Sequence, residues 1–120
     1  MKEVVFMDDS EQFRKELEQQ ADQFEAFLKS KLKPRTIYQH MVVIGHLVDF
    51  LCFNYGVTQF EDIRRGMVCS SFRRWYCSNM QDRTESEVNT SVKKFFHFLV
   101  MEQGISVGKD VLIGLKITAR

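Results

Sequence analysis

Proline is almost absent from this chain, and glycine is scarce. The 120 residues include one proline and six glycines, and no Ser/Gly-rich or repetitive stretch could act as an internal linker. No unit recurs at a fixed period, which excludes a repeat protein. Because a chain of this length buries one hydrophobic core rather than two, we expect a single folded unit.

Cysteine is also scarce, and the three thiols follow no recognisable pattern. Cys52, Cys69 and Cys77 are odd in number and contain no Cys-x-x-Cys pair, so neither a disulfide framework nor a zinc site is expected. The three histidines likewise lack the spacing of metal ligands. We expect reduced, mostly buried cysteines, and neither a metal ion nor any other cofactor.

Long apolar runs are missing as well. No stretch approaches the roughly 18 consecutive apolar residues of a membrane span. The first residues, MKEVVFMDDSEQ, turn acidic after a few apolar positions, whereas a secretory signal peptide needs a longer apolar region and a cleavage site. These absences favour a cytoplasmic protein with no membrane partner.

The net charge is only +1, but the charges are unevenly distributed along the chain. Residues 1–30 contain four Lys/Arg and eight Asp/Glu, whereas residues 31–120 contain thirteen and eight. The leading segment is therefore acidic and the body of the chain is basic. A basic excess of this size suits a surface that binds nucleic acid, but it is also found in many proteins that bind none.

Apolar residues recur at helical spacing in the first quarter of the chain. Phe13, Leu17, Phe24 and Leu28 fall on one stripe, with Ala21 beside them. This spacing of three and four residues is typical of an amphipathic helix. The sequence therefore predicts a first long helix with a buried apolar face.

Pro34 predicts the end of that helical region, because proline lacks the backbone N–H and constrains Lys33 away from helical angles. Thr36 is then expected to cap a second helix with its hydroxyl. The following sequence, IYQHMVVIGHLVDFLCFNYG, is apolar around much of the helical circumference, which is typical of a central helix surrounded by neighbours. Asn54 and Gly56 are expected to end it.

The next segment predicts shorter helices. A helical turn is expected around Phe60 and Ile63, and NMQDR reads as a loop. Between them, a helix should carry the apolar residues Val68, Phe72, Trp75 and Tyr76. After the loop, Thr84 and Glu87 have the spacing of a capping box, which marks the start of the last strong helix.

That last helix separates two sets of side chains and is expected to stop at Gly104. The inward side should carry Val88, Val92, Phe95 and Leu99. The opposite side, at about 100° per residue, should carry Thr90, Lys93 and His97, with Lys94 next to them. A charged helix face of this kind is either simply solvated or a binding surface, and periodicity alone leaves both interpretations open.

The C-terminal tail, ISVGKDVLIGLKITAR, adds a possible short helix from Asp110. Its apolar residues are too many for a solvated end, so they should pack on the bundle or on another chain. No segment has the pattern of two strands joined by a hairpin turn. The predicted fold class is therefore all-α, a compact bundle of four to five helices.

Several segments together resemble the core-binding, or SAM-like N-terminal, domain of the phage integrase family, the tyrosine recombinases that include the Xer type. In chain order they are FEAFLKSKLKPRTIYQHMVVIGHLVDFL, FEDIRRGMVCSSF and SEVNTSVKKFFHFLVMEQGI. The positions that match the family pattern are Phe24 to Leu28, Thr36, Phe50 with Leu51, Ile63 to Val68, and Val92 to Leu99. The resemblance implies an acidic helical extension at residues 1–20, a core-binding-like domain at 21–108, and a short apolar tail or linker start at 109–120.

The resemblance also implies a function. In that family the domain forms half of a clamp around duplex DNA, with basic and small polar side chains on the phosphates. Thr36, Lys93 and Lys94 match motif positions, and Thr90 stands where a small polar residue is usual. His97, beside the lysines, could donate to phosphate when protonated, and charge alone adds the candidates Arg35, Arg64, Arg65, Arg73 and Arg74.

The sequence departs from the family pattern at two places. His40 stands where a tyrosine is common, and Met41 and Val42 stand where basic residues often follow. Glu85 and Glu87 lie at the start of the last helix, where carboxylates that faced phosphate would repel it. These departures leave open whether DNA affinity has been kept.

Nothing in the sequence supplies the chemistry that cuts DNA. The family's catalytic domain provides a tyrosine nucleophile together with cationic groups that stabilise the phosphoryl transition state, whereas Tyr38, Tyr55 and Tyr76 match no such motif. The expected function is a non-catalytic module that binds duplex DNA in site-specific recombination or DNA integration. The alternative is a helical protein interaction domain, and self-association through the N-terminal helix or the C-terminal tail is plausible in either case.

Overall fold

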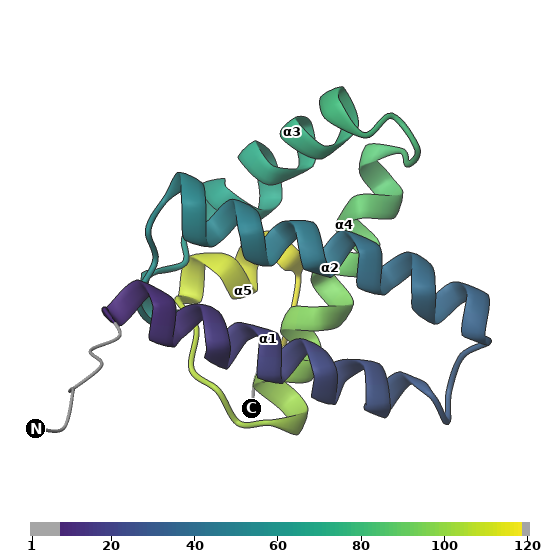
Figure 1. Cartoon of the computed structure of the whole chain (residues 1–120), viewed down its shortest axis with the longest axis horizontal. Helices are drawn as coiled ribbons and strands as arrows, with labels where there is room; N and C mark the ends of the chain where they lie inside the picture. Colours follow the sequence, from purple (N-terminus) through teal and green to yellow (C-terminus); the bar gives the residue numbers. More distant parts are fainter. Residues whose placement is uncertain (1–7, 119–120) are drawn as a thin grey trace, which may run out of the picture.

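The computed structural model describes residues 8–118 (Figure 1). These residues form five α-helices and three shorter helical turns, joined by loops. In chain order they are α1 (Asp9–Leu28), α2 (Pro34–Asn54), the 3-10 helix η1 (Phe60–Asp62), the π-helix η2 (Met67–Ser71), α3 (Phe72–Asn79), α4 (Glu85–His97), the π-helix η3 (Phe98–Glu102) and α5 (Lys109–Leu115). No strand occurs within these residues. The all-α fold class and the five-helix bundle predicted from periodicity are confirmed.

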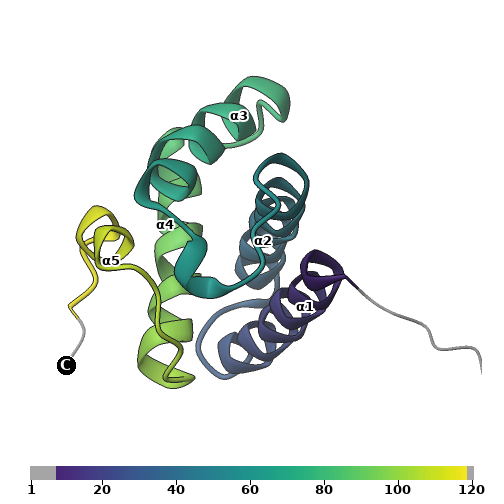
Figure 2. The same ribbon diagram turned by 90° about the vertical axis from the view of Figure 1, so that its left-hand side faces the viewer.

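The helices pack around α4 and α2. Helices α1 and α2 run antiparallel as a long pair (Figure 1), and α4 crosses behind them. In the view at right angles, α4 lies between the α1–α2 pair on one side and α5 on the other, while α3 covers the end where α4 begins (Figure 2). This arrangement leaves one side of α4 uncovered along its length.

The core is continuous and rich in aromatic rings. The ring of Phe24 on α1 lies 5.4 Å from the rings of both Phe95 on α4 and Phe98 on η3, centroid to centroid. Aromatic pairs at this separation and tilt are favourable beyond the area that they bury. The first and last long helices of the chain are therefore joined directly through one cluster of phenylalanines.

Helix α2 is the central helix, as its composition predicts. Val43, Ile44, Leu47 and Leu51 have no exposed surface, and α2 contacts α1, α3 and α4. By length and composition alone α2 could also cross a membrane. In this bundle its most apolar face is covered by the neighbouring helices, which is the ordinary environment of a core helix in a globular domain.

Helix α1 is one uninterrupted element that crosses the expected boundary between residues 20 and 21. Phe13 and Leu17 lie in the expected extension, and each is 1% exposed in the same core as Phe24. Asp8 caps the helix, since its Oδ1 accepts a hydrogen bond from the backbone N–H of Glu11 at 2.8 Å. Residues 1–7 of the expected extension and residues 119–120 of the tail lie outside the described range.

Thr36 does not cap α2, and that prediction is wrong. The helix begins at Pro34, and Lys33 is the capping residue, with φ −70° and ψ 149°. Proline is well suited to the first helical position, because its missing N–H has no partner there and its fixed φ is already helical. The proline therefore starts α2 rather than delaying it, and Thr36 lies within the first turn.

The remaining helix boundaries follow the predictions closely. Thr84 and Glu87 form the expected capping box at the start of α4, and Gly104 adopts a left-handed φ of 65° where the helix ends after η3. Helix α5 forms in the tail and packs against η2. Val111, Leu115 and Ile117 are buried there, whereas Ile113 is 67% exposed, so most of the apolar tail packs on its own bundle.

Candidate nucleic-acid interface

Helix α4 presents a basic surface because its opposite side is fixed in the core. Val88, Val92 and Leu99 have no exposed surface, and Phe95 is 1% exposed. The side chains on the other side are therefore held outward: Thr90, Lys94 and His97 are exposed and Lys93 is half-buried. The predicted outward placement is confirmed for Thr90, Lys94 and His97, whereas Lys93 lies nearer the edge of the buried side than predicted.

The four outward residues line one groove between α4 and the end of α1. The groove has a volume of about 720 Å³ and combines an apolar floor with a polar wall. Phe24, Phe27, Leu28 and Leu32 form the floor, and Lys31, Asn89, Thr90, Lys93, Lys94 and His97 form the wall. Three lysines and a histidine therefore line the same groove, and no carboxylate does.

The lysines of this wall keep their charge available. No ion pair involves Lys31, Lys93 or Lys94 within the described residues. The ammonium of Lys31 lies 4.9 Å from the centroid of the Phe27 ring, a cation–π contact that holds the stem against the groove floor. An ammonium without a carboxylate partner is free to bind an anion from solution.

Thr90 is held in place from within the helix. Its Oγ1 donates a hydrogen bond to the backbone oxygen of Ser86 at 3.0 Å, which leaves the hydroxyl oxygen as an acceptor. The small side chain also keeps the helix surface low between the longer lysines. In a phosphate contact Thr90 would therefore permit close approach rather than supply the main donor.

The two carboxylates at the start of α4 are already engaged. Glu87 Oε1 accepts the backbone N–H of Thr84 at 2.9 Å, and the hydrogen bonds from Thr84 lower the pKa of Glu87. Glu85 Oε1 lies 3.5 Å from Nε of Arg73. Their negative charge is thus balanced locally, by the helix start and by Arg73.

A buried polar pair lies beneath the basic surface. His40 on α2 and Ser91 on α4 are 9% and 4% exposed, and His40 Nδ1 lies 2.7 Å from Ser91 Oγ. Burial lowers the pKa of His40, and the positive charges of Lys94 and Arg83 lower it further. His40, at a position where the resemblance predicts a tyrosine, is therefore a core histidine with a lowered pKa.

The arginine candidates are divided between several places. Arg65 and Arg73 line a second cleft, between η2, α4 and α5. Arg74 is exposed and donates to Ser70 Oγ at 2.8 Å. Arg64 is also exposed, in the turn before η2.

Arg35 and Thr36 lie in the first turn of α2, where the free backbone amides and the positive end of the helix dipole favour anions. The turn that joins α1 to α2 carries Lys31 and Leu32, which both line the α4 groove. The exposed side chain of Arg35 and the half-buried one of Thr36 therefore follow the groove directly along the chain.

Sequence reasoning missed four residues that the fold brings to these surfaces. Lys31 and Asn89 line the α4 groove, Lys116 lines the second cleft, and Arg83 lies beside His40. Asn89 adjoins Thr90 in the sequence, so its place at the edge of the outward face could have been found from the helical period. Lys116 could not have been found, since its position depends on how α5 packs.

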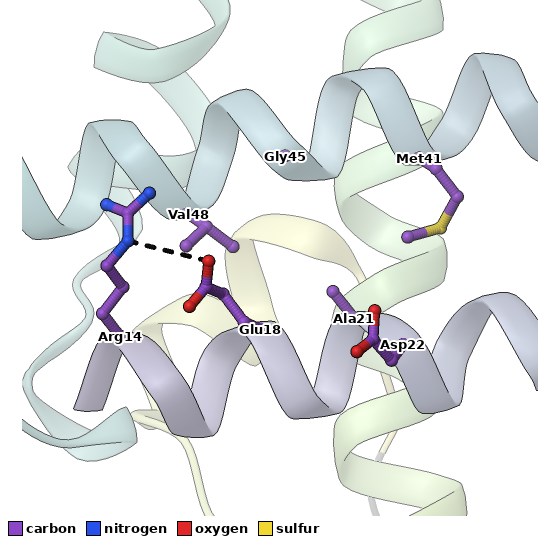
Figure 3. A pocket seen from close by; sticks show the side chains of 7 residues that line it. All are labelled: Arg14, Glu18, Ala21, Asp22, Met41, Gly45 and Val48. Carbon is purple, nitrogen blue, oxygen red and sulfur yellow. Dashed lines mark ion pairs between the residues drawn. The ribbon is translucent and has the colours of Figure 1, made fainter. Parts of the chain in front are cut away.

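A different kind of groove lies between α1 and α2 (Figure 3). Its floor contains Ala21, Gly45 and Val48, and its volume is about 440 Å³. Arg14 and Glu18 stand at one end, 3.8 Å apart between Nε and Oε2, as the dashed line shows (Figure 3). Its small apolar floor and mixed charges are unlike the basic surface of α4.

Further side chains surround Arg14 at the end of the α1–α2 groove. Arg14 also bonds to Asp49 through Nη2, and its guanidinium lies 4.9 Å from the centre of the Phe53 ring. Phe53 is 76% exposed, and Tyr38 near the start of α2 is 70% exposed. Exposed aromatic residues are common in surfaces that bind other proteins.

Tyr76 lacks the surroundings of an activated nucleophile. Tyr76 has no exposed surface, and burial followed by the nearby Asp82 raises its pKa to about 12. An activated tyrosine needs cationic neighbours that lower its pKa, and Tyr76 has a carboxylate at 3.5 Å instead. Within residues 8–118, no group of three or more His, Cys, Asp or Glu side chains could hold a metal ion.

Comparison with known proteins gives no match to a protein family, to a curated protein or to a solved structure. The resemblance to the core-binding domain of tyrosine recombinases therefore stays a prediction from sequence motifs. The groove on α4 and its charges do not depend on that resemblance.

Proposed function

We propose that this chain is a non-catalytic DNA-binding module that holds duplex DNA against the exposed side of α4, as the core-binding domain of a tyrosine recombinase does. One observation carries the proposal: Lys93, Lys94 and Lys31 line a single groove that no carboxylate enters. The sequence motif and the helical period both point to two of these lysines, Lys93 and Lys94. A cytoplasmic location is part of this proposal.

The binding would be dominated by phosphate. Lysine side chains act as point charges on flexible stems and contact phosphate oxygens without reading the bases. Because α4 is fixed by its buried residues, its cations are presented in a constant arrangement that follows the sugar-phosphate backbone. The first turn of α2, with Arg35 and Thr36, adds free backbone N–H groups that can donate to a second phosphate.

The chain is proposed to bind DNA without cutting it. Tyr76 is buried beside a carboxylate, and Tyr38 and Tyr55 match no sequence motif of a nucleophilic tyrosine with the cationic groups that phosphoryl transfer needs. In recombination or integration, the chemistry would belong to a catalytic domain. Incubation with duplex DNA should therefore give neither a nick nor an adduct that survives denaturant.

The experiment that tests the proposal is a fluorescence anisotropy titration of a short labelled duplex at several salt concentrations. Each lysine that contacts phosphate should account for about 0.9 of the log-log slope of affinity against salt. Lys93→Ala combined with Lys94→Ala should lower affinity on every sequence and flatten the slope by up to roughly two units. The protein should stay folded, since neither side chain is part of the core.

A matched control removes two positive charges elsewhere. Lys15→Ala combined with Lys109→Ala changes two exposed lysines on α1 and α5, neither of which lines the α4 groove. The control should bind DNA nearly as tightly as the unmodified protein. Equal binding by both double variants, or no binding at low salt by the unmodified protein, would remove α4 from DNA recognition.

The second candidate function is protein binding, and the α1–α2 groove favours it. Phe53 and Tyr38 are the two most exposed aromatic side chains of the described residues, and they lie on the same helix as Gly45 at the groove floor. Substitution of Phe53 by Ser should leave DNA binding unchanged if the first proposal is right. If the chain bound no DNA, and if Phe53→Ser abolished the binding of a protein partner, the two results together would favour the alternative.

A further inference from the structure

Three cationic side chains from three different elements converge on the cleft between η2, α4 and α5. The cleft has a volume of about 550 Å³. Arg65 precedes η2, Arg73 belongs to α3 and Lys116 ends α5, and Ser70 and Asn89 add hydroxyl and amide groups. No carboxylate lines the cleft.

Two of the three cations have no ion pair within the described residues. The backbone N–H of Arg65 donates to Asp110 Oδ2 at 2.9 Å, so the carboxylate fixes the chain and leaves the guanidinium unpaired. Arg73 has its Nε 3.5 Å from Glu85, yet this nitrogen is buried and makes no hydrogen bond. A buried guanidinium nitrogen without a partner is costly.

The backbone around the cleft is also unusual. Lys116 adopts a left-handed conformation, with φ 57° and ψ 46°, where α5 ends. This conformation normally falls to glycine or asparagine and is unfavourable for lysine. At Lys116, which lines the cleft, this conformation ends α5, since the backbone N–H donates to the oxygens of Ile113 and Leu112.

Gly114 determines how closely α5 approaches η2. A Cβ at this position would lie 2.8 Å from both Arg65 Cγ and Cys69 Sγ, so only glycine lets the two elements lie this close. The close approach brings Lys116 and Arg65 to the same cleft. The cationic wall is therefore a product of the packing between α5 and η2.

We propose that this cleft binds a phosphate group, either of a nucleic-acid backbone or of a small phosphate ester. Guanidinium groups match phosphate oxygens with paired N–H donors, and an ammonium adds a point charge. Arg65 and Lys116 have no ion-pair partner within the described residues, and a bound dianion would supply one for both. The polar groups of Ser70 and Asn89 supply further donors.

The cleft adjoins the α4 groove but does not depend on it. Asn89 lines both, so a strand held along α4 could continue into the cleft. The cleft can equally hold a phosphate group when α4 binds nothing, because its cations come from other elements. Its test therefore uses inorganic phosphate as well as DNA.

The first measurement is a titration of the whole chain with inorganic phosphate at constant ionic strength, followed by NMR. The Nε–Hε signals of Arg65 and Arg73 and the backbone amides of Ser70 and Gly114 should shift together and saturate. Constant ionic strength removes the general effect of screening. Shifts that never saturate, or that spread evenly over the surface, would overturn the proposal.

The decisive variant is Lys116→Gly. Glycine suits the left-handed conformation, so the variant should fold at least as well as the original while it lacks the ammonium. Phosphate affinity should fall by roughly five- to tenfold, as for the loss of one charged hydrogen bond in an open cleft. Lys109→Ala, which removes an exposed lysine from the same helix, should leave phosphate affinity unchanged. Equal phosphate affinity in Lys116→Gly and the original chain would refute the site.

The source of the phosphate is separated by the DNA titration. If Lys116→Gly weakens duplex binding in parallel with phosphate binding, the cleft takes the nucleic-acid backbone. If it weakens only phosphate binding, the cleft takes a small phosphate ester. The proposal that α4 binds DNA is tested separately by the Lys93→Ala, Lys94→Ala double variant. If that proposal failed, the result of the phosphate titration would still stand.

Discussion

His40 on α2 and Ser91 on α4 are joined by a hydrogen bond of 2.7 Å inside a core that is otherwise apolar. Both residues are buried, so the pair connects the central helix to the helix that carries the basic surface. A buried polar pair must stay satisfied, since an unpaired member would cost about 1 to 3 kcal/mol. The pair therefore fixes the register between α2 and α4.

This pair predicts a loss of stability in mild acid. The pKa of His40 is lowered from its ordinary 6.5 by burial and by Lys94 and Arg83, so the unfolded chain takes up a proton more readily than the folded one. The stability from the neutral ring is complete above pH 6.5 and declines as the pH falls below it, until the folded state is protonated as well. Chemical denaturation at pH 7.5 and pH 5 measures the difference.

Two histidine variants serve as the test and the control for that measurement. His40→Gln keeps a group that can bond to Ser91 but does not titrate, and it should remove most of the dependence between pH 7.5 and pH 5. His97→Gln, on the exposed side of α4, should keep it. An unchanged dependence in His40→Gln would show that other groups are responsible.

Substitution of Phe95 measures how much the aromatic cluster contributes to stability. Its ring contacts Phe24 and Phe96 and is 1% exposed, so Phe95→Ala should destabilise the protein by about 3 to 5 kcal/mol. This is a large part of the stability of a small domain. Ile113→Ala, at a position that is 67% exposed, should change the melting temperature little. Equal effects of the two substitutions would contradict the placement of the core.

Thr84 and Thr36 offer a direct test of helix capping. Thr84 Oγ1 accepts the backbone N–H of Glu87 at 3.2 Å, whereas Thr36 lies within the first turn of α2. Thr84→Ala should therefore cost about 1 kcal/mol of unfolding free energy, and Thr36→Ala should cost less. Urea denaturation of the two variants gives the comparison, and a larger loss from Thr36→Ala would restore it as the capping residue.

The tail gives a fourth prediction. Val111, Leu115 and Ile117 are buried, so removal of residues 109–120 exposes apolar surface on η2 and α4 and should lower the melting temperature by several degrees. Sedimentation of the shortened chain shows whether the uncovered surface then causes self-association. If the truncation changed neither the melting temperature nor the oligomeric state seen in sedimentation, the packing of α5 would contribute nothing to the fold.

Much of the bundle could be predicted from sequence because its signals are local. The buried side of α4 follows from residues three and four apart, and the capping box needs only Thr84 and Glu87. The start of α2 is harder to predict, because proline both ends a preceding helix and begins a following one. The hydroxyl of Thr36 is a second signal for a helix start, two residues later in the sequence.

The candidate sites were predictable only in part. Lys93 and Lys94 lie on one helix, so their common face follows from the period. Arg65, Asn89 and Lys116 are far apart in the sequence, and they meet only because Gly114 lets α5 lie against η2. No local pattern contains that information, since it depends on packing between distant segments.

The π-helical turn η2 sets which side chains after it face the core. Met67–Ser71 holds about one residue more per turn than an α-helix would, and this wider turn absorbs a residue that in a regular α-helix would rotate everything after it by about 100° around the axis. Phe72 and Tyr76 therefore reach the core, and Arg73 reaches the cleft. Deletion of one residue within η2 would leave a regular α-helical turn with the same faces, so both aromatic rings should stay in the core and Arg73 should stay at the cleft.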